Sequence, residues 1–218
     1  MEVPIPTMEH LIVSRFSVPR LDAATAGFHR DEAWLGDRLE LFRRFFVPSV
    51  QRLEVPAILL CSSASAERVA EETRDLSWVR VEVQDDWYGG WTGGEEQMLT
   101  RLDSDDAVHE DWLKALEAAP EGYEAYVTNG FYRYDIATGH LYQRRRREPS
   151  PLAAFPGGRN PYRWDHAQLP EHCRTYSMPK AYLLQAIHGG NLSNRRPSWR
   201  HFFRRRSLEH LRPFNLSL

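Results

Sequence analysis

Cysteine is scarce in this chain, which has only Cys61 and Cys173 among its 218 residues. Two cysteines build neither a disulfide framework nor a paired zinc motif, so a reducing compartment is the simpler prediction. Long apolar runs are missing as well, because no stretch approaches the roughly 20 apolar residues of a membrane span. The first 16 residues carry acids and prolines where a signal peptide would need a basic end and an apolar run. These absences predict a cytoplasmic protein.

Lysine is scarce too, since only Lys114 and Lys180 are present and all other basic residues are arginines. The net charge is −2, but the acidic and basic residues are segregated along the chain. Residues 1–139 contain 13 Lys and Arg against 26 Asp and Glu, whereas residues 140–218 contain 15 basic and 4 acidic residues. Codon usage would explain a preference for arginine but not this segregation. A basic C-terminal third suits phosphate groups on a small donor, on a polymer or on a membrane surface, and the last would make the protein peripheral at the inner membrane face.

The pattern of apolar residues in the first half is that of an α/β protein. Short apolar or alternating runs, typical of strands, are followed by longer runs with helical spacing. Strands are expected at 10–14, 55–61, 78–83 and 97–102, and helices at 34–47 and 63–76. This alternation favours a largely parallel sheet with flanking helices. We therefore predict a single Rossmann-like α/β domain over residues 1–218.

The second half of the chain has a different pattern. Residues 123–135 and 140–147, joined by Ala137-Thr138-Gly139, are typical of a β-hairpin. Residues 178–187 fit a strand or a short helix, and the tail from His201 fits an amphipathic basic helix.

Three carboxylates, Asp103, Asp105 and Asp106, follow the strand expected at 97–102. A helix is expected directly after them, because apolar residues from Val108 to Ala119 recur at helical spacing. The acids would thus lie at the carboxyl end of a strand, where ligands bind in open α/β sheets.

Two interpretations of the acids are open. In an extended segment Asp103 and Asp105 point the same way, and they repel each other unless a cation lies between them. Mg²⁺ and Mn²⁺ prefer such oxygen ligands, which favours a metal site. The alternative is a helix cap, which needs only one side chain such as Asp106, with the other acids in solvent.

Five stretches of the sequence, taken in order, carry a resemblance to a known family. They are HLIVSRFSV, WLGDRLELFRRFFVPSV, TRLDSDDAVHEDW, NGFYRYDIATGHLY and QAIHGGNLSN, and they span roughly residues 8–195. On these stretches the sequence resembles a bacterial family of rhamnosyltransferases, whose members look like glycosyltransferases of the GT-A fold. The resemblance implies a GT-A-like domain with a nucleotide-sugar donor. It supports glycosyl transfer more strongly than it supports rhamnose as the sugar.

The resemblance also implies roles for three of the residues. In the D-x-D element that begins at Asp103, this first acid would face the ribose and the sugar of the donor. Asp105 would ligate a Mn²⁺ or Mg²⁺ ion that bridges the two phosphates. His188 matches the histidine that completes the metal site in many GT-A enzymes, although a histidine capping a helix C-terminus is the alternative for this position.

Other candidate residues flank the donor and the acceptor. Arg15 and Arg101 are candidate contacts to the base or the diphosphate, with a structural role equally open for each. An inverting enzyme also needs a carboxylate base for the acceptor hydroxyl. Among the few acids of the basic third, Asp165 is the first candidate and Glu148 the second, and either could instead pair with a neighbouring arginine.

Metal-dependent glycosyl transfer to a hydroxyl acceptor is the function that these observations favour. Residues 8–139 would bind the nucleotide sugar and the metal, and residues 140–218 would face a saccharide or another hydroxyl acceptor, with an anionic polymer or a lipid-linked group among the candidates. An alternative is a protein that binds nucleic acid or an anionic polymer through the arginine runs at 144–147 and 204–206. A metal-dependent phosphohydrolase is a third option, but it calls for more His and Asp clusters than the sequence contains.

Overall fold

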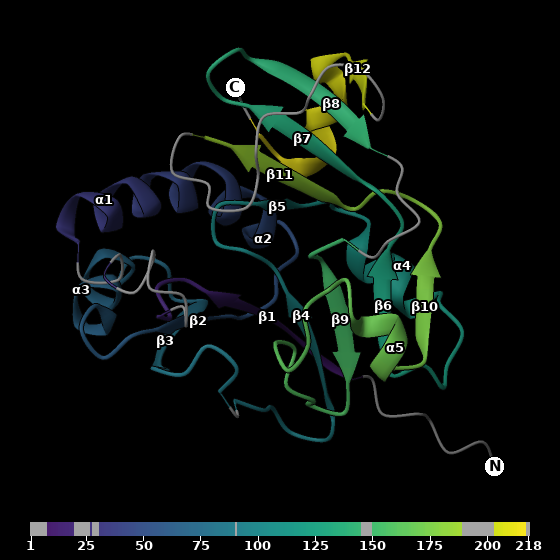
Figure 1. The fold of residues 1–218 in the computed structure, drawn as a ribbon, viewed down its shortest axis with the longest axis horizontal. Helices are drawn as coiled ribbons and strands as arrows, with labels where there is room; N and C mark the ends of the chain where they lie inside the picture. The colour runs from purple at the N-terminus through teal and green to yellow at the C-terminus, as the bar shows by residue number, and fades with distance from the viewer. Residues whose placement is uncertain are drawn as a thin grey trace.

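The computed structural model describes residues 8–19, 27, 31–89, 91–144, 150–188 and 203–216. Its strands form two sheets, one with seven strands and one with five. The smaller sheet lies above the larger one in the view of Figure 1, and α1 and α3 lie beside them on the left. In the described part of the chain, no helix is both long enough and apolar enough to span a membrane.

The larger sheet has the strand order β10-β6-β9-β4-β1-β2-β3. Its strands are β1 (Glu9–Arg15), β2 (Ala57–Cys61), β3 (Val79–Val83), β4 (Gln97–Arg101), β6 (Ala125–Thr128), β9 (Ala153–Pro156) and β10 (Thr175–Met178). Neighbouring strands are parallel except β9, which runs antiparallel to both β4 and β6. The predicted α/β architecture with a mostly parallel central sheet is therefore confirmed.

The central strands are apolar because both faces of the sheet are covered. All five residues of β2 are buried. In β1, Ile12 belongs to one hydrophobic cluster, whereas Leu11 and Val13 belong to another. Since successive side chains of a strand point to opposite faces, the two clusters lie on the two sides of the sheet.

A long helical run covers one of these faces. It consists of α1 (Glu32–Leu41), the π-helical turn η2 (Phe42–Phe46) and α2 (Val47–Gln51), so the helix predicted at 34–47 is confirmed and is longer than expected. The run begins at Asp31, whose Oδ1 accepts the N–H groups of Ala33 (2.9 Å) and Trp34 (3.0 Å), as expected of an N-cap. The remaining helices are short, namely α3 (Ala66–Glu72), α4 (Trp112–Glu117), α5 (Leu169–His172) and the 3-10 helix η3 (Leu208–Phe214).

The smaller sheet has the strand order β12-β8-β7-β11-β5. Its strands are β5 (Ala107–Val108), β7 (Phe131–Asp135), β8 (His140–Arg144), β11 (Leu183–Ile187) and β12 (Phe203–Arg206). Its own hydrophobic cluster includes Phe45 from the helical run and Leu211 and Phe214 from η3. Apolar contacts therefore attach the smaller sheet to the helical run.

Two predictions for the second half are corrected here. The hairpin is β7–β8, with its turn at 136–139 as expected, but residues 125–128 form β6 in the other sheet. The tail does not begin as a basic helix, because residues 203–206 form β12, which pairs antiparallel with β8. Pairing with the edge of β8 satisfies the backbone hydrogen bonds of residues 203–206, and this outweighs the helical spacing of their side chains.

Three strands of the larger sheet continue into the smaller one at their carboxyl ends. The linkers are residues 102–106 between β4 and β5, 129–130 between β6 and β7, and 179–182 between β10 and β11. The carboxyl ends of β4, β6 and β10 therefore meet the smaller sheet at one junction. In open α/β sheets, ligands bind beyond this end of the strands.

Candidate active site

The acid cluster lies in the linker from β4 to β5, at the junction of the two sheets. The N–H of Asp106 donates to the carbonyl oxygen of Asp103 (3.0 Å), which closes a turn between the sheets. The prediction of a helix directly after the acids is wrong, because β5 comes next and α4 starts only at Trp112. In a turn the side chains do not alternate as in an extended strand, so the expected shared direction of Asp103 and Asp105 has no basis here. The N-cap position of α4 is Asp111, which means that Asp106 does not cap it.

Asp105 contacts two cationic or potentially cationic side chains. Its Oδ2 lies 2.7 Å from Nη1 of Arg38, which belongs to α1, and 3.0 Å from Nε2 of His188, which follows β11. His188 is 83 residues away in the chain, so its predicted proximity to Asp105 is observed, while its role as a metal ligand stays a prediction. Burial pushes the pKa of Asp105 upward, but Arg38 and His188 outweigh burial and the pKa is lowered from its ordinary value.

Asp106 is buried like Asp105, but it forms a structural hydrogen bond instead of an ion pair. Its Oδ1 accepts the N–H of Ala186 in β11 (3.1 Å), which ties this strand to the acid turn. Burial, together with the charges of Asp105 and Asp103, raises the pKa of Asp106 well above its ordinary value. The chain therefore places an ionised carboxylate next to a carboxyl group that resists ionisation.

Asp105 and His188 form a hydrogen-bonded pair whose spacing is also compatible with two ligands of one metal ion. Its two nearest atoms, Oδ2 and Nε2, are 3.0 Å apart. Adjacent ligands of an octahedral ion with bonds of about 2.1 Å are also about 3 Å apart. An imidazole beside a carboxylate favours Mn²⁺ over Mg²⁺.

The described residues do not form a complete metal cage. Among them there is no group of three or more His, Cys, Asp or Glu side chains that could hold a metal ion. Two protein ligands suit a metal that keeps several waters and shares the phosphates of a substrate. Ser104, between the two acids, is fully buried, and its hydroxyl has no hydrogen-bond partner among the described residues.

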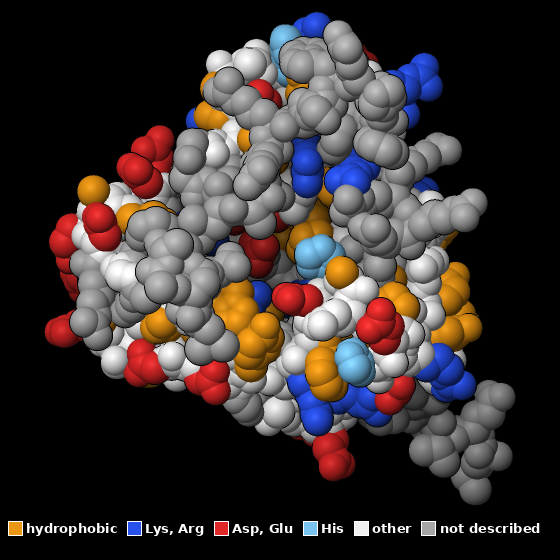
Figure 2. Space-filling view, viewed as in Figure 1, with side chains coloured by type: hydrophobic (Ala, Val, Ile, Leu, Met, Phe, Trp, Pro, Cys, Tyr) orange, Lys and Arg blue, Asp and Glu red, His pale blue; other side chains and the backbone are white. Residues whose placement is uncertain are grey.

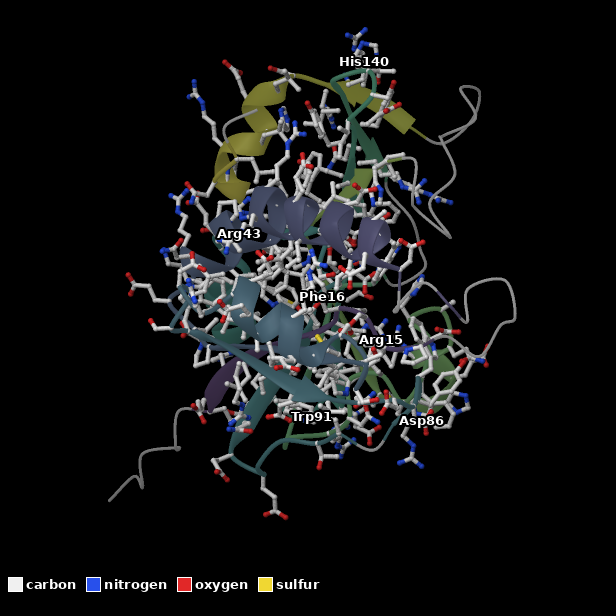
Figure 3. The ribbon with its side chains drawn as sticks, turned by 90° about the vertical axis from the view of Figure 1, so that its left-hand side faces the viewer. Arg15, Phe16, Arg43, Asp86, Trp91 and His140 are labelled. Atoms are coloured by element: carbon white, nitrogen blue, oxygen red, sulfur yellow. The ribbon has the colours of Figure 1, made fainter. Side chains whose placement is uncertain are left out.

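Arg15 lies at the carboxyl end of β1 and is stacked between two aromatic rings. Its guanidinium carbon is 3.5 Å from the ring centroid of Trp87 and 4.2 Å from that of Tyr162. Its Nη1 also donates to the Trp87 carbonyl oxygen (3.3 Å). Figure 3 shows Arg15 beside Phe16, below the α1 helix. The cation–π contacts hold this arginine at the edge of the sheet where a donor is expected.

Arg101 ends β4 and is buried. Its guanidinium donates to the carbonyl oxygens of Pro151 (2.7 Å), Pro161 (3.2 Å) and Trp164 (3.0 Å). Burial lowers its pKa to about 10. These bonds hold the loop around β9 against β4, so they give Arg101 the structural role that was the alternative for it. They do not support its predicted contact to the donor.

Asp103 and the candidate base Asp165 lie in the described part of the chain, whereas the candidate base Glu148 does not. Asp103 is half-buried, and Asp165 is exposed in the turn before α5. Asp165 directly follows Trp164, whose carbonyl oxygen accepts from Arg101 at the end of β4, so the chain brings Asp165 to the neighbourhood of the strand that leads to Asp103. Glu148 lies outside the described residues, as do residues 145–147 of the first arginine run.

Sequence reasoning missed Arg38. The signal was present, because Arg38 falls on the helical stripe that also includes the buried Leu35, Leu39 and Phe42. A charged side chain on such a stripe needs a partner, and Asp105 is that partner. Figure 2 shows a hollow in the middle of this face, with acidic, basic and histidine side chains around it.

Comparisons with known proteins give no family for this chain. No family model and no curated protein matches it. Among solved structures, S. aureus TarS 1–349 in complex with UDP-GlcNAc matches with a TM-score of 0.43 and 12% identity over 84% of this chain and 60% of that chain. The inositol-1-phosphate CTP transferase of T. maritima matches with a TM-score of 0.44 and 9% identity, over 82% of this chain and 89% of that chain. HddC from Yersinia pseudotuberculosis, complexed with GMP-PN, matches with a TM-score of 0.37 and 10% identity over 83% and 89%.

The chain thus spans only 60% of the TarS 1–349 chain that it matches. Likeness at these scores carries no inference about activity.

Proposed function

We propose that this protein is a metal-dependent glycosyltransferase that moves a sugar from a nucleotide-sugar donor to a hydroxyl acceptor. The observation that carries the proposal is the pairing of Asp105 with His188, 3.0 Å apart, at the carboxyl end of β4. Two segments that are distant in the chain bring one carboxylate and one imidazole to the place where α/β sheets bind ligands. The resemblance of the sequence to rhamnosyltransferases makes a nucleotide-activated rhamnose the first donor to test.

The chain's own residues would hold the donor around a Mn²⁺ or Mg²⁺ ion. Asp105 and His188 would ligate the metal, which when bound neutralises the charge that grows on the leaving nucleoside diphosphate. Asp103, half-buried in the same turn, would face the ribose and the sugar. Arg15, fixed between its two rings, would neutralise the donor at the end of β1.

The acceptor side requires a group that removes the hydroxyl proton. Asp165 suits this step because it is exposed and follows Trp164, whose carbonyl oxygen is bonded to Arg101 at the end of β4. A carboxylate in that place can take the proton if the acceptor hydroxyl comes within hydrogen-bond distance. Glu148 remains the second candidate for the base.

The test is hydrolysis and transfer with a panel of nucleotide sugars, with and without Mn²⁺. We expect turnover with at least one donor and its loss in EDTA. Asp105→Asn and His188→Ala should each lower turnover by about 100-fold or more, because each removes a ligand of the ion that stabilises the leaving group. Asp111→Asn is the matched control, since this acid lies six residues further on and its side chain is 42% exposed.

The melting temperature separates loss of a ligand from loss of the fold. Mn²⁺ with donor should raise the melting temperature of the wild type and of Asp111→Asn, but not that of Asp105→Asn. A His188→Ala protein with wild-type turnover and a wild-type Mn²⁺ response would remove the basis of the proposal.

A protein that only binds anionic polymers is the second candidate. The observation in its favour is that Arg204 and Arg205 are exposed on β12, at an edge of the smaller sheet. Such a protein would have no use for the buried pairing of Asp105 with Arg38 and His188, which costs desolvation. We therefore assign the arginines of β12 to the acceptor side of a transferase.

A further inference from the structure

Arg38 is the partner of Asp105 that the proposed metal site does not use. Its Nη1 lies 2.7 Å from the same carboxylate oxygen that His188 contacts at 3.0 Å. The two side chains of this ion pair are largely withdrawn from solvent, with 18% of Arg38 and 8% of Asp105 exposed. In this structure a fixed positive charge therefore occupies the oxygen that a metal ion would need.

The helix holds Arg38 in this place. Leu35 and Leu39, on either side of it along α1, are buried in the core. The ring of Trp34 lies 5.9 Å from the guanidinium carbon, and Asp31 fixes the first turn of the helix. A long side chain on a packed helix loses less freedom when it binds than one on a loop, which suits a residue that contacts a ligand.

The guanidinium of Arg38 also has an unused donor. Its Nε is buried and has no hydrogen-bond partner among the described residues. The hydroxyl of Ser104, which precedes Asp105 in the chain, is also buried and also has no hydrogen-bond partner among the described residues. A buried donor without a partner is costly, and an arginine nitrogen can be satisfied only by an acceptor. The buried Nε of Arg38, whose Nη1 contacts Asp105, therefore favours a ligand that brings an acceptor oxygen to this guanidinium.

We propose that Arg38 competes with the divalent cation for Asp105 in the donor-free protein, and that it binds a diphosphate oxygen of the donor once the metal has taken Asp105. This inference rests on the proposed function and adds to it a residue that the metal ligands do not include. In the metal–donor complex, the metal ion would replace Arg38 at Asp105, and the diphosphate would be the anion that Arg38 binds. Metal and donor should therefore bind cooperatively, each tightening the other by the same factor.

The decisive measurement is the binding of Mn²⁺ alone, followed by electron paramagnetic resonance, to the wild type and to Arg38→Gln. Removing the arginine takes one cation away from Oδ2 of Asp105 and so removes a positive charge from the site of a dication. We expect Arg38→Gln to bind Mn²⁺ about tenfold more tightly, while its kcat/KM for the donor falls about 100-fold. A residue that only supported the shape of Asp105 would give the opposite sign for Mn²⁺, because its removal would disorder the ligand.

Two further variants keep the test interpretable. Arg43→Gln is the matched control, since Arg43 follows on the same helical run and also forms an ion pair, with Asp75 at 2.9 Å. That pair is exposed, and Figure 3 shows Arg43 well apart from Arg15, so neither measurement should change. Arg38→Lys keeps the charge but not the planar fork, so we expect Mn²⁺ binding near that of the wild type and a lowered kcat/KM for the donor.

The possible failures are distinguishable. Wild-type protein that binds no Mn²⁺, alone or with UDP, GDP or dTDP, would overturn the proposed function and this inference together. Wild-type Mn²⁺ binding that is unchanged or weaker in Arg38→Gln would overturn the inference alone. If Arg38→Gln does not fold, Mn²⁺ binding by Arg38→Lys decides, because weakening as large as that of Asp105→Asn would identify Arg38 as a structural support.

Discussion

Asp105 and Asp106 are neighbours in the chain, yet their surroundings move their pKa values in opposite directions. Burial raises both, but only Asp105 has Arg38 and His188 close enough to reverse the effect. The result is one carboxylate that can serve as an anionic ligand and one that serves as a tie to β11. Groups that differ in this way are frequent at functional sites, because ligand binding and structural support need different protonation states.

His109 is a partly buried histidine near the junction whose protonation would disturb its contacts. Its ring packs edge-on against Tyr182 and Phe214, with 5.6 and 5.4 Å between ring centroids. Its Nδ1 accepts the N–H of Asp111 (3.0 Å), an arrangement that a doubly protonated ring would lose. Burial, partly opposed by Asp111, lowers the pKa of His109 from its ordinary value of 6.5.

We expect His109 to make the folded state less stable as the pH falls. Because its folded pKa lies below the unfolded one, the unfolded chain takes up the proton first, and stability is lost as the pH drops from 6.5 towards the folded pKa. His109→Asn keeps an acceptor but does not titrate, so between about pH 7.5 and about pH 5 its free energy of unfolding should fall less than that of the wild type. Urea denaturation at both pH values measures this difference. An identical pH dependence in the two proteins would contradict the assignment.

The sequence could indicate some residues of the site but not others. Asp103 and Asp105 could be predicted from the pattern, because acids after an apolar strand are expected at the edge of a sheet. His188 was indicated by the resemblance to rhamnosyltransferases, since the pattern alone also suited a histidine that caps a helix. Arg38 lies on the apolar stripe of α1, which signals a charged residue in need of a partner, but the sequence could not identify Asp105 as that partner, because this depends on how α1 is placed against the sheet. Arg101 had two possible roles, and only the positions of three carbonyl oxygens from a distant loop favour the structural one.

At the scale of elements, the acid turn depends on the attachment of β5 to the helical run. The buried hydroxyl of Ser49 in α2 donates to the Phe46 carbonyl oxygen (3.0 Å) and accepts the N–H of Val108 in β5 (3.2 Å). This single side chain thus connects the helical run to the two-residue strand that follows the acids. Among the described residues, the only strand that pairs with residues 107–108 is β11, and both side chains are buried in the hydrophobic clusters.

Ser49→Ala should therefore weaken both the fold and the site. It leaves the buried amide of Val108 without this acceptor, so we expect the free energy of unfolding to fall by about 1–3 kcal/mol in urea denaturation. Mn²⁺ binding should weaken as well, because β5 leads directly out of the acid turn. Ser63→Ala is the control, since Ser63 is exposed and bonds to Asp85, and it should change stability by less than about 0.5 kcal/mol. Equal stability of the two variants would show that the contact to β5 is unimportant.

The elements were predictable where local pattern and tertiary position agree. Strands β1 to β4 and the long helical run follow from apolar runs that are buried on one or both faces. The antiparallel insertion of β9 between β4 and β6 was not predictable, because residues 153–156 come from a segment rich in Pro and Gly and pair with strands far away in the chain. The same reason applies to β12, whose arginines pair with β8 although their spacing suits a helix.

For the whole molecule, the dominant feature is the segregation of charge. The net charge is −2, yet residues 140–218 carry 15 basic and 4 acidic residues. Acidic side chains gather over α1, α3 and β3 on the left of Figure 2, while Lys and Arg side chains lie mainly on the opposite side and at the top. A surface of this kind attracts anions in spite of the negative net charge, and salt screens the attraction between exposed charges.

We expect the protein to bind an anionic matrix such as heparin through its smaller sheet. Arg204 and Arg205 are exposed on β12, so replacing both with Gln should lower the salt concentration that elutes the protein and weaken low-salt binding about three- to tenfold, from roughly 0.5 kcal/mol for each exposed charge. The double variant Arg43→Gln, Arg44→Gln is the control, because it removes the same charge from the acidic half, and it should elute with the wild type. Donor hydrolysis should be equal in all three proteins, since neither pair lies at the acid turn. Co-elution of all three would mean that the arginines of β12 are only solvated, and that an anionic acceptor has to be sought elsewhere on the protein.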